Sequence, residues 1–345
     1  MRARPRHAGA AALAAVLATA CSGGAGAASA GPGGSPSTTG GDSAATASSG
    51  GPHGTATASA TGETAPTTGA DSTTGPDAGG TGAPPLVCNG AEHLCDRPFD
   101  RVIFPGTHNA FSATEAGFSS IVANQHRTLA EQLDDGIRLL LLDITEDGGE
   151  TALCHQFCTF GKTPHLDALA DIRAFLEANP SEVIAIIYQD DVPGTAVEQD
   201  MATAGLDGML YTHPPGAPWP TLRTLIEQGT RLVVFAEAGG PPPPWWHHAW
   251  DHVWDTPYTF NDPADFNCMP NRGDPQNPLF LVNHWLSTTI GLPDEGRAAE
   301  ANAYDVLDAR IQACLDLHGR LPTFVAVDFY DVGDLLAVVR DRNAP

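Results

Sequence analysis

Basic residues are scarce in this chain, and lysine is almost missing. The 345 residues include 17 Lys and Arg against 41 Asp and Glu, a formal net charge of −24, and Lys162 is the single lysine. A nucleic-acid-binding surface needs Lys and Arg clusters to neutralise phosphates, so nucleic acid is excluded as a partner. Tight electrostatic attachment to an anionic bilayer is disfavoured for the same reason. A phosphate would have to be held by arginine, histidine or a metal ion.

Nucleotide-binding and zinc-binding motifs are also missing. No GxGxxG or GxxxxGK[ST] loop follows the first predicted strand, which disfavours a nucleotide site. No CxxC pair has suitably spaced histidines, which disfavours zinc against disulfides. Apart from Cys21 the cysteines form an even set, which suits disulfides in an exported protein. Short loops favour the pairs Cys88–Cys95 and Cys154–Cys158. Cys268 and Cys314 then remain for a long-range pair.

The N-terminus has the pattern of an export signal. Residues 1–20 open with three arginines and continue as a short run rich in alanine. The run is too short for a membrane span, which needs about 20 strongly apolar residues. Residues 17–21 resemble a bacterial lipobox, so we predict lipidation at Cys21 and an outer-membrane or cell-surface lipoprotein. Simple secretion after cleavage is the alternative.

Residues 21–85 lack the side chains from which a core is built. They consist mainly of Gly, Ser, Thr, Ala and Pro, with no aromatic residue and no Lys or Arg. Such a segment buries too little apolar surface to offset its chain entropy, so we predict a disordered linker. Residues 86–345 then remain for one folded domain, close to the usual size of an α/β barrel.

The predicted domain alternates apolar runs with helical patterns. Uniformly apolar runs predict strands buried on both faces, as in a parallel sheet covered by helices. These runs are 101–104, 137–144, 152–155, 183–189, 231–236, 279–284 and 323–330. Helical spacing occurs at 128–134, 166–178, 221–228, 304–318 and 332–342. Strand and helix in alternation give either an open doubly wound sheet or a closed barrel.

Polar side chains gather at the C-terminal ends of the apolar runs. They are His108 and Asn109 after the first run, Asp143, His155, Gln189, Asp190 and Asp191, then Asn283 and His284, and Asp328 in the last. In a barrel all of them would converge on one rim, where such enzymes keep their chemistry. A single buried histidine is usually structural, but titratable groups at successive strand ends are hard to explain as core.

His108, His155 and Asp328 form a set suited to cleaving a phosphodiester. One histidine can take the proton of an attacking hydroxyl while the other gives a proton to the leaving oxygen. A carboxylate behind one imidazole fixes its tautomer and stabilises its charged form. Phosphoryl transfer also needs positive charge against the phosphate oxygens.

Several stretches of the domain carry a family resemblance when taken together. In order they are 95–99 leading into 104–109, 132–138 leading to 142–143, then 153–155, 175–183, 281–284 and 324–330. They resemble the phosphatidylinositol-specific phospholipase C X-domain superfamily, in particular the secreted and plant-type branch of PLC-like phosphodiesterases. The resemblance covers almost all of the folded region. It implies an α/β fold, a distorted TIM barrel that forms a single catalytic domain.

The resemblance also implies roles for the site residues. His108 would activate an inositol 2-hydroxyl with the support of Asp328, and His155 would protonate the departing diacylglycerol oxygen. The first products would be a cyclic phosphodiester and diacylglycerol. No motif fixes the headgroup. Residues at the ends of the sixth and last strands are predicted to contact the substrate: Asn283, His284, Trp285 and Tyr330.

The chain departs from the family at the phosphate- and metal-binding positions. Metal-independent bacterial members have Asp and Arg where Asn109 and Asp143 stand, and Asn followed by Asp is the pattern of calcium-dependent members. Two glutamates of that calcium pattern are replaced by Leu141 and Gln189. We predict a Ca²⁺ site of Asn109, Asp143, Gln189 and Asp190, since Ca²⁺ takes several oxygen ligands. The alternative is that Asp143 only hydrogen-bonds within the rim. No nucleotide or organic cofactor is expected.

Three further features are interpreted more simply. Arg138 begins its strand and is predicted to be structural. Trp245 and Trp246 follow a proline run, and their loop either dips into lipid or packs against the domain. Three nearby histidines without metal-ligand spacing are predicted to be surface residues: His247, His248 and His252.

Two functions are compatible with these residues. The first is an exported, monomeric phosphodiesterase acting on a phosphoinositide-like or other glycerophospholipid diester. The second is a weakly active scaffold that binds lipid headgroups or glycans, which the missing arginine and incomplete metal set favour. Glycerophosphodiester phosphodiesterase, a fold relative with Glu-x-Asp on the second strand, is disfavoured because Leu141 breaks that pattern.

Overall fold

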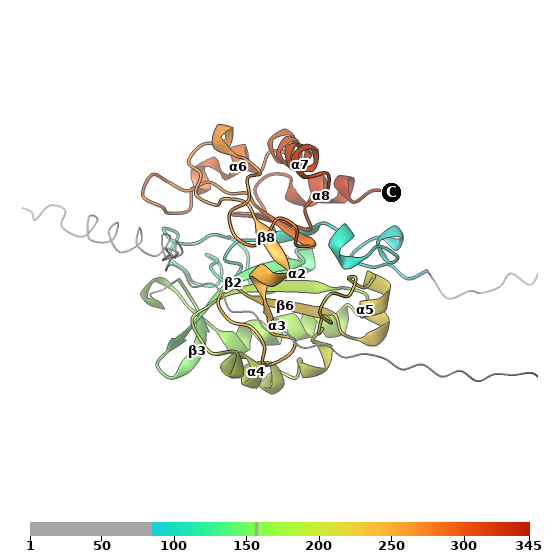
Figure 1. The fold of residues 1–345 in the computed structure, drawn as a ribbon. Coiled ribbons are helices and arrows are strands. Elements are labelled where there is room, and N and C mark those ends of the chain that lie inside the picture. Colours follow the sequence, from blue (N-terminus) through green and yellow to red (C-terminus); the bar gives the residue numbers. More distant parts are fainter. Residues whose placement is uncertain (1–84, 156–157) are drawn as a thin grey trace, which may run out of the picture. The chain divides into compact units, whose positions relative to one another are not determined.

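The structure, a computed structural model, describes residues 85–155 and 158–345 (Figure 1). The predicted signal segment, Cys21 and all but the last residue of the predicted linker lie outside the described residues. No helix among those that are described has the length and hydropathy needed to cross a membrane.

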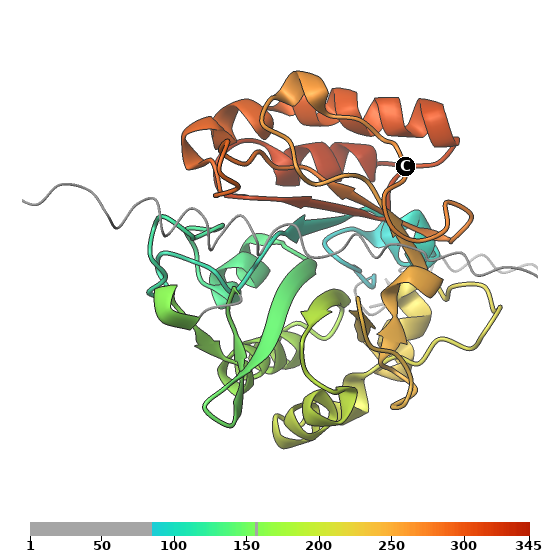
Figure 2. The same ribbon diagram turned by 60° about the vertical axis from the view of Figure 1, so that its left-hand side comes forward.

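Eight parallel strands form the wall of a barrel. They are β1 (Phe104–Thr107), β2 (Leu139–Asp147), β5 (Ile184–Asp190), β6 (Leu232–Ala236), β7 (His247–His248), β8 (Val253–Asp255), β9 (Leu279–Asn283) and β10 (Phe324–Val327). Their order is β7-β6-β5-β2-β1-β10-β9-β8, and each neighbouring pair is parallel. Within the described part of the chain no ladder joins β7 to β8, so the wall curls without closing (Figure 2). The predicted α/β fold, a distorted TIM barrel, is confirmed.

The predicted third strand is not part of this wall. Strand β3 (Glu150–Leu153) pairs antiparallel with β2, and β4 (Thr163–Pro164) pairs antiparallel with β3. Strand β2 runs past the rim, turns at two glycines and returns as β3, so that Leu153 lies opposite Ile144. His155 therefore reaches the rim from a returning hairpin rather than from the end of a parallel strand.

The described residues form seven α-helices, and the last of them follows the final strand. They are α2 (Leu129–Asp135), α3 (His165–Ala178), α4 (Gly194–Thr203), α5 (Leu222–Gln228), α6 (Ala298–Ala301), α7 (Tyr304–His318) and α8 (Leu335–Arg342) among the described residues. The five predicted helices are confirmed, and α4 and α6 were not predicted. Helix α2 starts at a capping box in which Thr128 and Glu131 satisfy each other's backbone N–H groups. It ends at Gly136, whose φ of 117° a side chain would strain.

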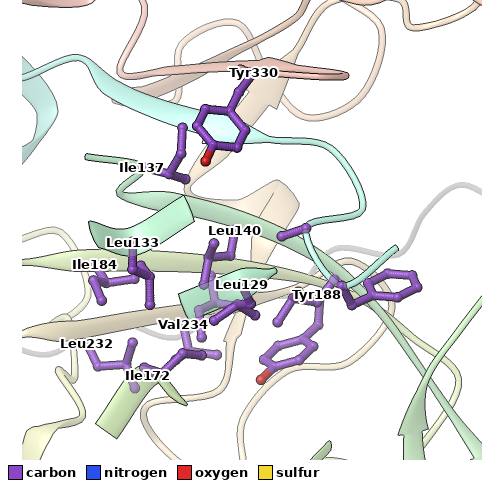
Figure 3. Packing of buried hydrophobic residues seen from close by; sticks show 14 of the residues in the cluster. Leu129, Leu133, Ile137, Leu140, Ile172, Ile184, Tyr188, Leu232, Val234 and Tyr330 are labelled. Atoms are coloured by element: carbon purple, nitrogen blue, oxygen red, sulfur yellow. The ribbon is translucent and has the colours of Figure 1, made fainter. Parts of the chain in front are cut away.

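Alternating residues of the strands build two apolar clusters, one on each face of the wall. The inner cluster fills the barrel and includes Phe104, Leu139, Phe235, Leu281 and Phe324. The outer cluster contains the strand residues that alternate with the inward-facing ones, and it packs against α2, α3, α4, α7 and α8. In Figure 3 side chains of α2 and α3, such as Leu133 and Ile172, lie against the outer face. Burial on both faces explains why the strand sequences are apolar without interruption.

The predicted disulfides are confirmed. Cys88–Cys95 ties the segment before β1, Cys154–Cys158 closes the loop that carries His155, and Cys268–Cys314 joins the loop after β8 to α7. Together they connect segments at both ends of the barrel.

The prediction that His247 lies on the surface is wrong. Its ring is buried beside β6, where Nδ1 donates to the carbonyl of Val234 at 2.8 Å and Nε2 accepts from the N–H of His213 at 2.9 Å. The ring of His252 meets that of His247 edge to face, with ring centroids 5.4 Å apart. It meets the ring of His213 in the same way, with centroids 5.6 Å apart. This histidine cluster lies on the side of the barrel where, among the described residues, no ladder joins β7 to β8.

The histidine cluster should make the domain sensitive to acid. Burial lowers the pKa of His247 to about 4, and burial also lowers the pKa values of His213 and His252. An unfolded histidine titrates near 6.5, so this stability is complete above about pH 6.5 and is lost as the pH falls toward 4. We expect His247→Gln to remove about 3 kcal/mol of that acid dependence in thermal melts between pH 7 and 4. Exposed His93→Gln is the matched control, and equal acid slopes in both variants would contradict the assignment.

Candidate active site

One layer of polar side chains lines the C-terminal mouth of the barrel. Every second residue of a strand faces the inside of the barrel, and this alternation continues to the last residue of each strand and just beyond it. The inward-facing residues are His108 after β1, Asp143 on β2, Gln189 on β5, Glu237 after β6, Asp255 on β8, Asn283 on β9 and Asp328 after β10. Both histidines approach this layer, His108 from β1 and His155 from the hairpin above β2. The gathering of five predicted rim residues at one mouth thus follows from the register: His108, Asp143, Gln189, Asn283 and Asp328.

The end of β1 is held by close packing. A Cβ on Gly106 would lie 2.7 Å from a methyl carbon of Leu139, so the strand requires glycine there. The N–H of His108 donates to the carbonyl of Val327 at 3.0 Å, and its carbonyl accepts from the amide of Gln125 at 2.8 Å. Asn109 follows with φ of 48°, a conformation that asparagine tolerates better than most residues. These contacts fix the backbone from which the His108 ring projects.

The ring of His108 has a carboxylate behind it and an indole beside it. Nδ1 lies 2.8 Å from Oδ1 of Asp328. Trp285 stacks on the ring with centroids 3.9 Å apart and an interplanar angle of 6°. Asn302 holds the turn after β10 by donating to the carbonyl of Asp328 at 2.8 Å. The carboxylate therefore sets the tautomer of His108, with a proton on Nδ1 and a lone pair on Nε2 directed away from Asp328.

The ring of His155 also has a carboxylate at one nitrogen. Nδ1 lies 3.3 Å from Oδ2 of Asp143, and the N–H of Cys154 donates to the carbonyl of Asp143 at 3.3 Å. The face of the ring meets Phe111 at 5.5 Å between centroids. Both histidine side chains keep about a quarter of their surface exposed, so a ligand in the mouth can reach them.

Two asparagines lie between the histidines. Nδ2 of Asn109 is 3.0 Å from Nε2 of His108 and 3.4 Å from Nε2 of His155. Oδ1 of Asn124 is 3.0 Å from Nε2 of His155, and its Nδ2 donates to Oδ1 of Asp328 at 3.0 Å. The two Nε2 atoms thus converge on one small region, an arrangement that acid–base cleavage of a single ligand would require. Asn124 was not predicted from the sequence, because it stands in a loop without regular spacing.

An ion-paired arginine occupies the other wall of the mouth. Arg272 donates to Asp255 at 2.6 and 3.0 Å and to Glu237 at 2.7 Å. Its guanidinium also lies 4.3 Å from the ring centre of Trp250 and 4.9 Å from that of Tyr258. Burial raises the pKa of Glu237 to about 7, although the nearby guanidinium pulls it down. Sequence reasoning missed this cluster, since its members come from separate loops.

Other predicted substrate contacts lie elsewhere. His284 is fully buried on the outer side of β9, where Nε2 donates to the carbonyl of Ala301 at 2.8 Å. Tyr330 is buried in the outer cluster, and its hydroxyl donates to Asp135 at 2.7 Å. Asn283 faces inward, but its side-chain NH₂ group donates to Asp255 and to the carbonyl of Thr256. Of the four predicted substrate contacts, only Trp285 touches a histidine of the pair.

Arg138 is structural, as predicted. Its guanidinium donates to Glu182 at 2.7 Å and to the carbonyls of Leu133 and Ile137 at 2.6 and 2.7 Å. These partners lie at the N-terminal end of β2, so the charge of Arg138 is used far from the mouth. The guanidinium that faces the mouth belongs to Arg272.

The residues of the predicted calcium site do not fit a calcium ion. Asp190 faces the outer side, and its two oxygens accept the N–H groups of Ala238 and Gly239 at 2.8 Å each. Asn109 presents its amide nitrogen to the histidines, and Asp143 is paired with His155. Among the described residues no group of three or more His, Cys, Asp or Glu side chains is arranged to hold a metal. Ca²⁺ takes several oxygen ligands, and three of the four predicted ones, Asn109, Asp143 and Asp190, have other partners.

The tryptophan loop packs against the domain. Trp246 is fully buried between Gly194 and Gly239, where a Cβ on either glycine would meet the indole within 2.8 Å. Trp245 is partly buried against the outer cluster. Of the two alternatives for this loop, packing against the domain holds for Trp246, because its ring is part of the core.

With this geometry in view, comparison with known proteins identifies the family. A family model described as PI-PLC X 1 matches residues 94–343. The chain belongs to the PI-PLC X family. A PI-PLC X domain-containing protein of Arthroderma benhamiae is 30% identical over 277 residues, 75% of this chain and 90% of that protein. One from Arabidopsis thaliana is 29% identical over 279 residues, 72% of this chain and 63% of that protein.

Solved structures support the same fold for this PI-PLC X domain. A mutant of phosphatidylinositol-specific phospholipase C from Staphylococcus aureus superposes with a TM-score of 0.51 at 14% identity, covering 72% of this chain and 95% of that one. A second structure of this Staphylococcus aureus protein gives 0.50 at 13% identity, covering 73% and 95%. At such identities the likeness shows the α/β barrel and leaves the chemistry to be argued from the site.

Proposed function

We propose that this PI-PLC X protein is an exported phosphodiesterase that cleaves a phosphoinositide-like or other glycerophospholipid diester by two-histidine acid–base chemistry. The observation that carries the proposal is the convergence of two imidazole Nε2 atoms on Asn109, with a carboxylate at the Nδ1 atom of each ring. An arrangement with one base and one acid on the two sides of a reacting group suits phosphodiester cleavage.

The proposed step balances in protons and bonds. Nε2 of His108 takes the proton from a hydroxyl next to the phosphate, and that oxygen forms a bond to phosphorus. The bond from phosphorus to the glycerol oxygen breaks, and His155 gives this oxygen a proton. A cyclic phosphodiester and a diacylglycerol-type alcohol result. Asp328 stabilises the imidazolium that His108 becomes.

The polar groups at the mouth suit a headgroup that carries hydroxyls. Arg272 is held against two inward-facing carboxylates on the wall opposite β1, where it can meet the part of a headgroup that extends from the histidines. Guanidinium and carboxylate groups together can donate to and accept from hydroxyls. This arrangement supports a polyhydroxylated headgroup within the proposed substrate class.

Export is supported by the cysteines and by a relative. The described cysteines are paired in three disulfides, as expected in an oxidising compartment. A protein of Arthroderma benhamiae that is 27% identical over 272 residues is named an uncharacterized secreted protein. We propose that lipid on Cys21 brings the domain to a membrane surface, with simple secretion as the alternative, and that the domain acts as a monomer.

Phosphorus NMR of the full chain with candidate diesters tests the proposal. Phosphatidylinositol in mixed micelles should give the signal of a cyclic inositol phosphate. Turnover should be equal with 1 mM EDTA and with added Ca²⁺, because three of the four predicted calcium ligands have other partners. A reaction that appears only with Ca²⁺ would contradict the metal-free mechanism. Absence of turnover on every diester, with headgroup binding retained, would leave the scaffold as the function.

The small disulfide around His155 should matter for turnover more than for stability. Replacing Cys154 and Cys158 by serine should lower kcat about 10- to 100-fold, since small misplacement of a catalytic group has effects of that size. The unfolding free energy should fall by only about 2 kcal/mol, as expected for so short a loop. The Cys88/Cys95 double serine variant is the control, because it opens a similarly short loop far from the histidines. Equal kcat values in the two double variants would contradict this role.

A further inference from the structure

Asn124 belongs to the loop that links β1 to α2, and this loop folds back onto the site. Its N–H donates to the carbonyl of Ser112 at 2.9 Å, and its carbonyl accepts the N–H of Phe329 at 2.7 Å. The residue is 2% exposed. Its backbone thus fastens the loop to the turn after β10, and its side chain is left for other contacts.

The side-chain amide of Asn124 lies between the two halves of the histidine pair. Nδ2 donates to Oδ1 of Asp328 at 3.0 Å. Oδ1 lies 3.0 Å from Nε2 of His155 and accepts from Nδ2 of Asn109 at 3.2 Å. Among the described residues this amide makes no hydrogen bond to the backbone of its own loop. Its polar atoms therefore serve the site and not the fold of the loop.

The charge of Asp328 favours one orientation of this amide, in which Nδ2 of Asn124 and Nδ1 of His108, 3.3 Å apart, share Oδ1 of Asp328 as their acceptor. The Asp328 carboxylate only accepts hydrogen bonds, so it must face the NH₂ group of Asn124. The carbonyl oxygen is then directed at His155, and it can only accept. If the amide were reversed, its carbonyl oxygen would face the Asp328 carboxylate, and two acceptors would meet. Its NH₂ group would then face the NH₂ group of Asn109, and two donors would meet. The Asp328 carboxylate thus determines what His155 meets on the far side of Asn124.

The two histidines consequently meet opposite partners at their Nε2 atoms. Nε2 of His108 faces the NH₂ group of Asn109 at 3.0 Å, which favours a lone pair there. Nε2 of His155 lies 3.0 Å from the carbonyl oxygen of Asn124, closer than the 3.4 Å to the NH₂ group of Asn109, and the nearer oxygen favours a proton there. A base needs the first state and an acid needs the second.

We infer that Asn124 is a positioning residue that assigns the acid role to His155. It holds the ring so that Nε2 carries the proton destined for the leaving oxygen, and it links this orientation to the carboxylate that supports His108. This inference rests on the proposed function, since it refines which histidine is the acid and why. It adds a residue that no spacing or motif in the sequence singles out.

Kinetics of the full chain give the first test. Asn124→Leu keeps the volume and removes both polar atoms, and we expect kcat to fall about 10- to 100-fold with KM within about threefold. Ser112→Ala is the matched control, because Ser112 bonds the carbonyl of Val122 in the same loop and touches neither histidine. A fall in kcat that Ser112→Ala reproduces would assign the effect to loop disorder and overturn the inference.

Nitrogen-15 NMR of the histidine rings gives a test without substrate. Spectra that correlate ring carbon-bound protons with both nitrogens show which nitrogen carries a proton, and His155→Gln and His108→Gln variants identify the two rings. We expect a protonated Nε2 on His155, an unprotonated Nε2 on His108, and loss of this difference in Asn124→Leu. The same pattern in Asn124→Leu as in the unchanged chain would overturn the inference. Because no turnover is needed, this result stands apart from success or failure of the proposed reaction.

Discussion

Replacing His108 or His155 by glutamine is expected to lower kcat on phosphatidylinositol by about 10²- to 10⁴-fold in each case, without unfolding the domain. General acid and general base groups contribute factors of this size. Both rings lie at the mouth and keep about a quarter of their side-chain surface exposed, so neither substitution opens a cavity in the core. Initial rates from phosphorus NMR and melting curves from circular dichroism measure the two effects separately.

The control for this prediction is His93→Gln. His93 is exposed in the segment before β1, and its Nε2 bonds the carbonyl of Asn343 at 2.8 Å, a contact that glutamine can replace. The double variant of His108 and His155 should lose less than the product of the two single losses, because the groups act on one step. Turnover retained in both single variants would end the two-histidine mechanism.

The fold could be predicted because its signal is local and repeated. Apolar runs buried on both faces predicted the wall strands β2, β5, β6, β9 and β10 to within three residues at each end. The first strand was predicted at 101–104, three residues too early, since β1 spans Phe104–Thr107. Strands β7 and β8 were missed because they span His247–His248 and Val253–Asp255, too few residues to show a pattern. The hairpin of β3 was misread for another reason. Its composition suits any strand, and only its antiparallel pairing with β2 shows that it leaves the wall.

The candidate site could be predicted only where a side chain follows a strand directly. His108, Asp143 and Asp328 have fixed places in the register, so their convergence follows from the barrel. Asn124 depends on how an irregular loop folds back, which no periodicity encodes. Arg272 lies 35 residues after Glu237 and 17 after Asp255, and its contacts became apparent only in three dimensions. The sequence therefore shows the reacting groups better than the residues that orient them.

Replacing Arg272 by methionine is expected to lower the unfolding free energy by about 3–5 kcal/mol, because it leaves a buried carboxylate without its cation. Asp255 is fully buried and receives two guanidinium hydrogen bonds, at 2.6 and 3.0 Å. Glu237 can lose its negative charge by taking up a proton, since burial already raises its pKa to about 7. Asp255 keeps donors from Asn283 and from the backbone N–H of residue 272, but it loses its compensating charge. Urea denaturation of the full chain at pH 7.5 measures the loss.

A solvent-exposed pair in the same chain gives the scale for this effect. Arg223 makes a two-bonded contact with Asp96 at 2.7 and 3.2 Å, but the Asp96 side chain is 76% exposed and that of Arg223 is 38% exposed. Arg223→Met should therefore cost at most about 1 kcal/mol. Adding Asp255→Asn to Arg272→Met should recover part of the loss, because the uncompensated charge is then gone. If Arg272→Met costs no more than Arg223→Met, water reaches Asp255 and the wall opposite the histidines is not the buried charged surface that a headgroup site requires.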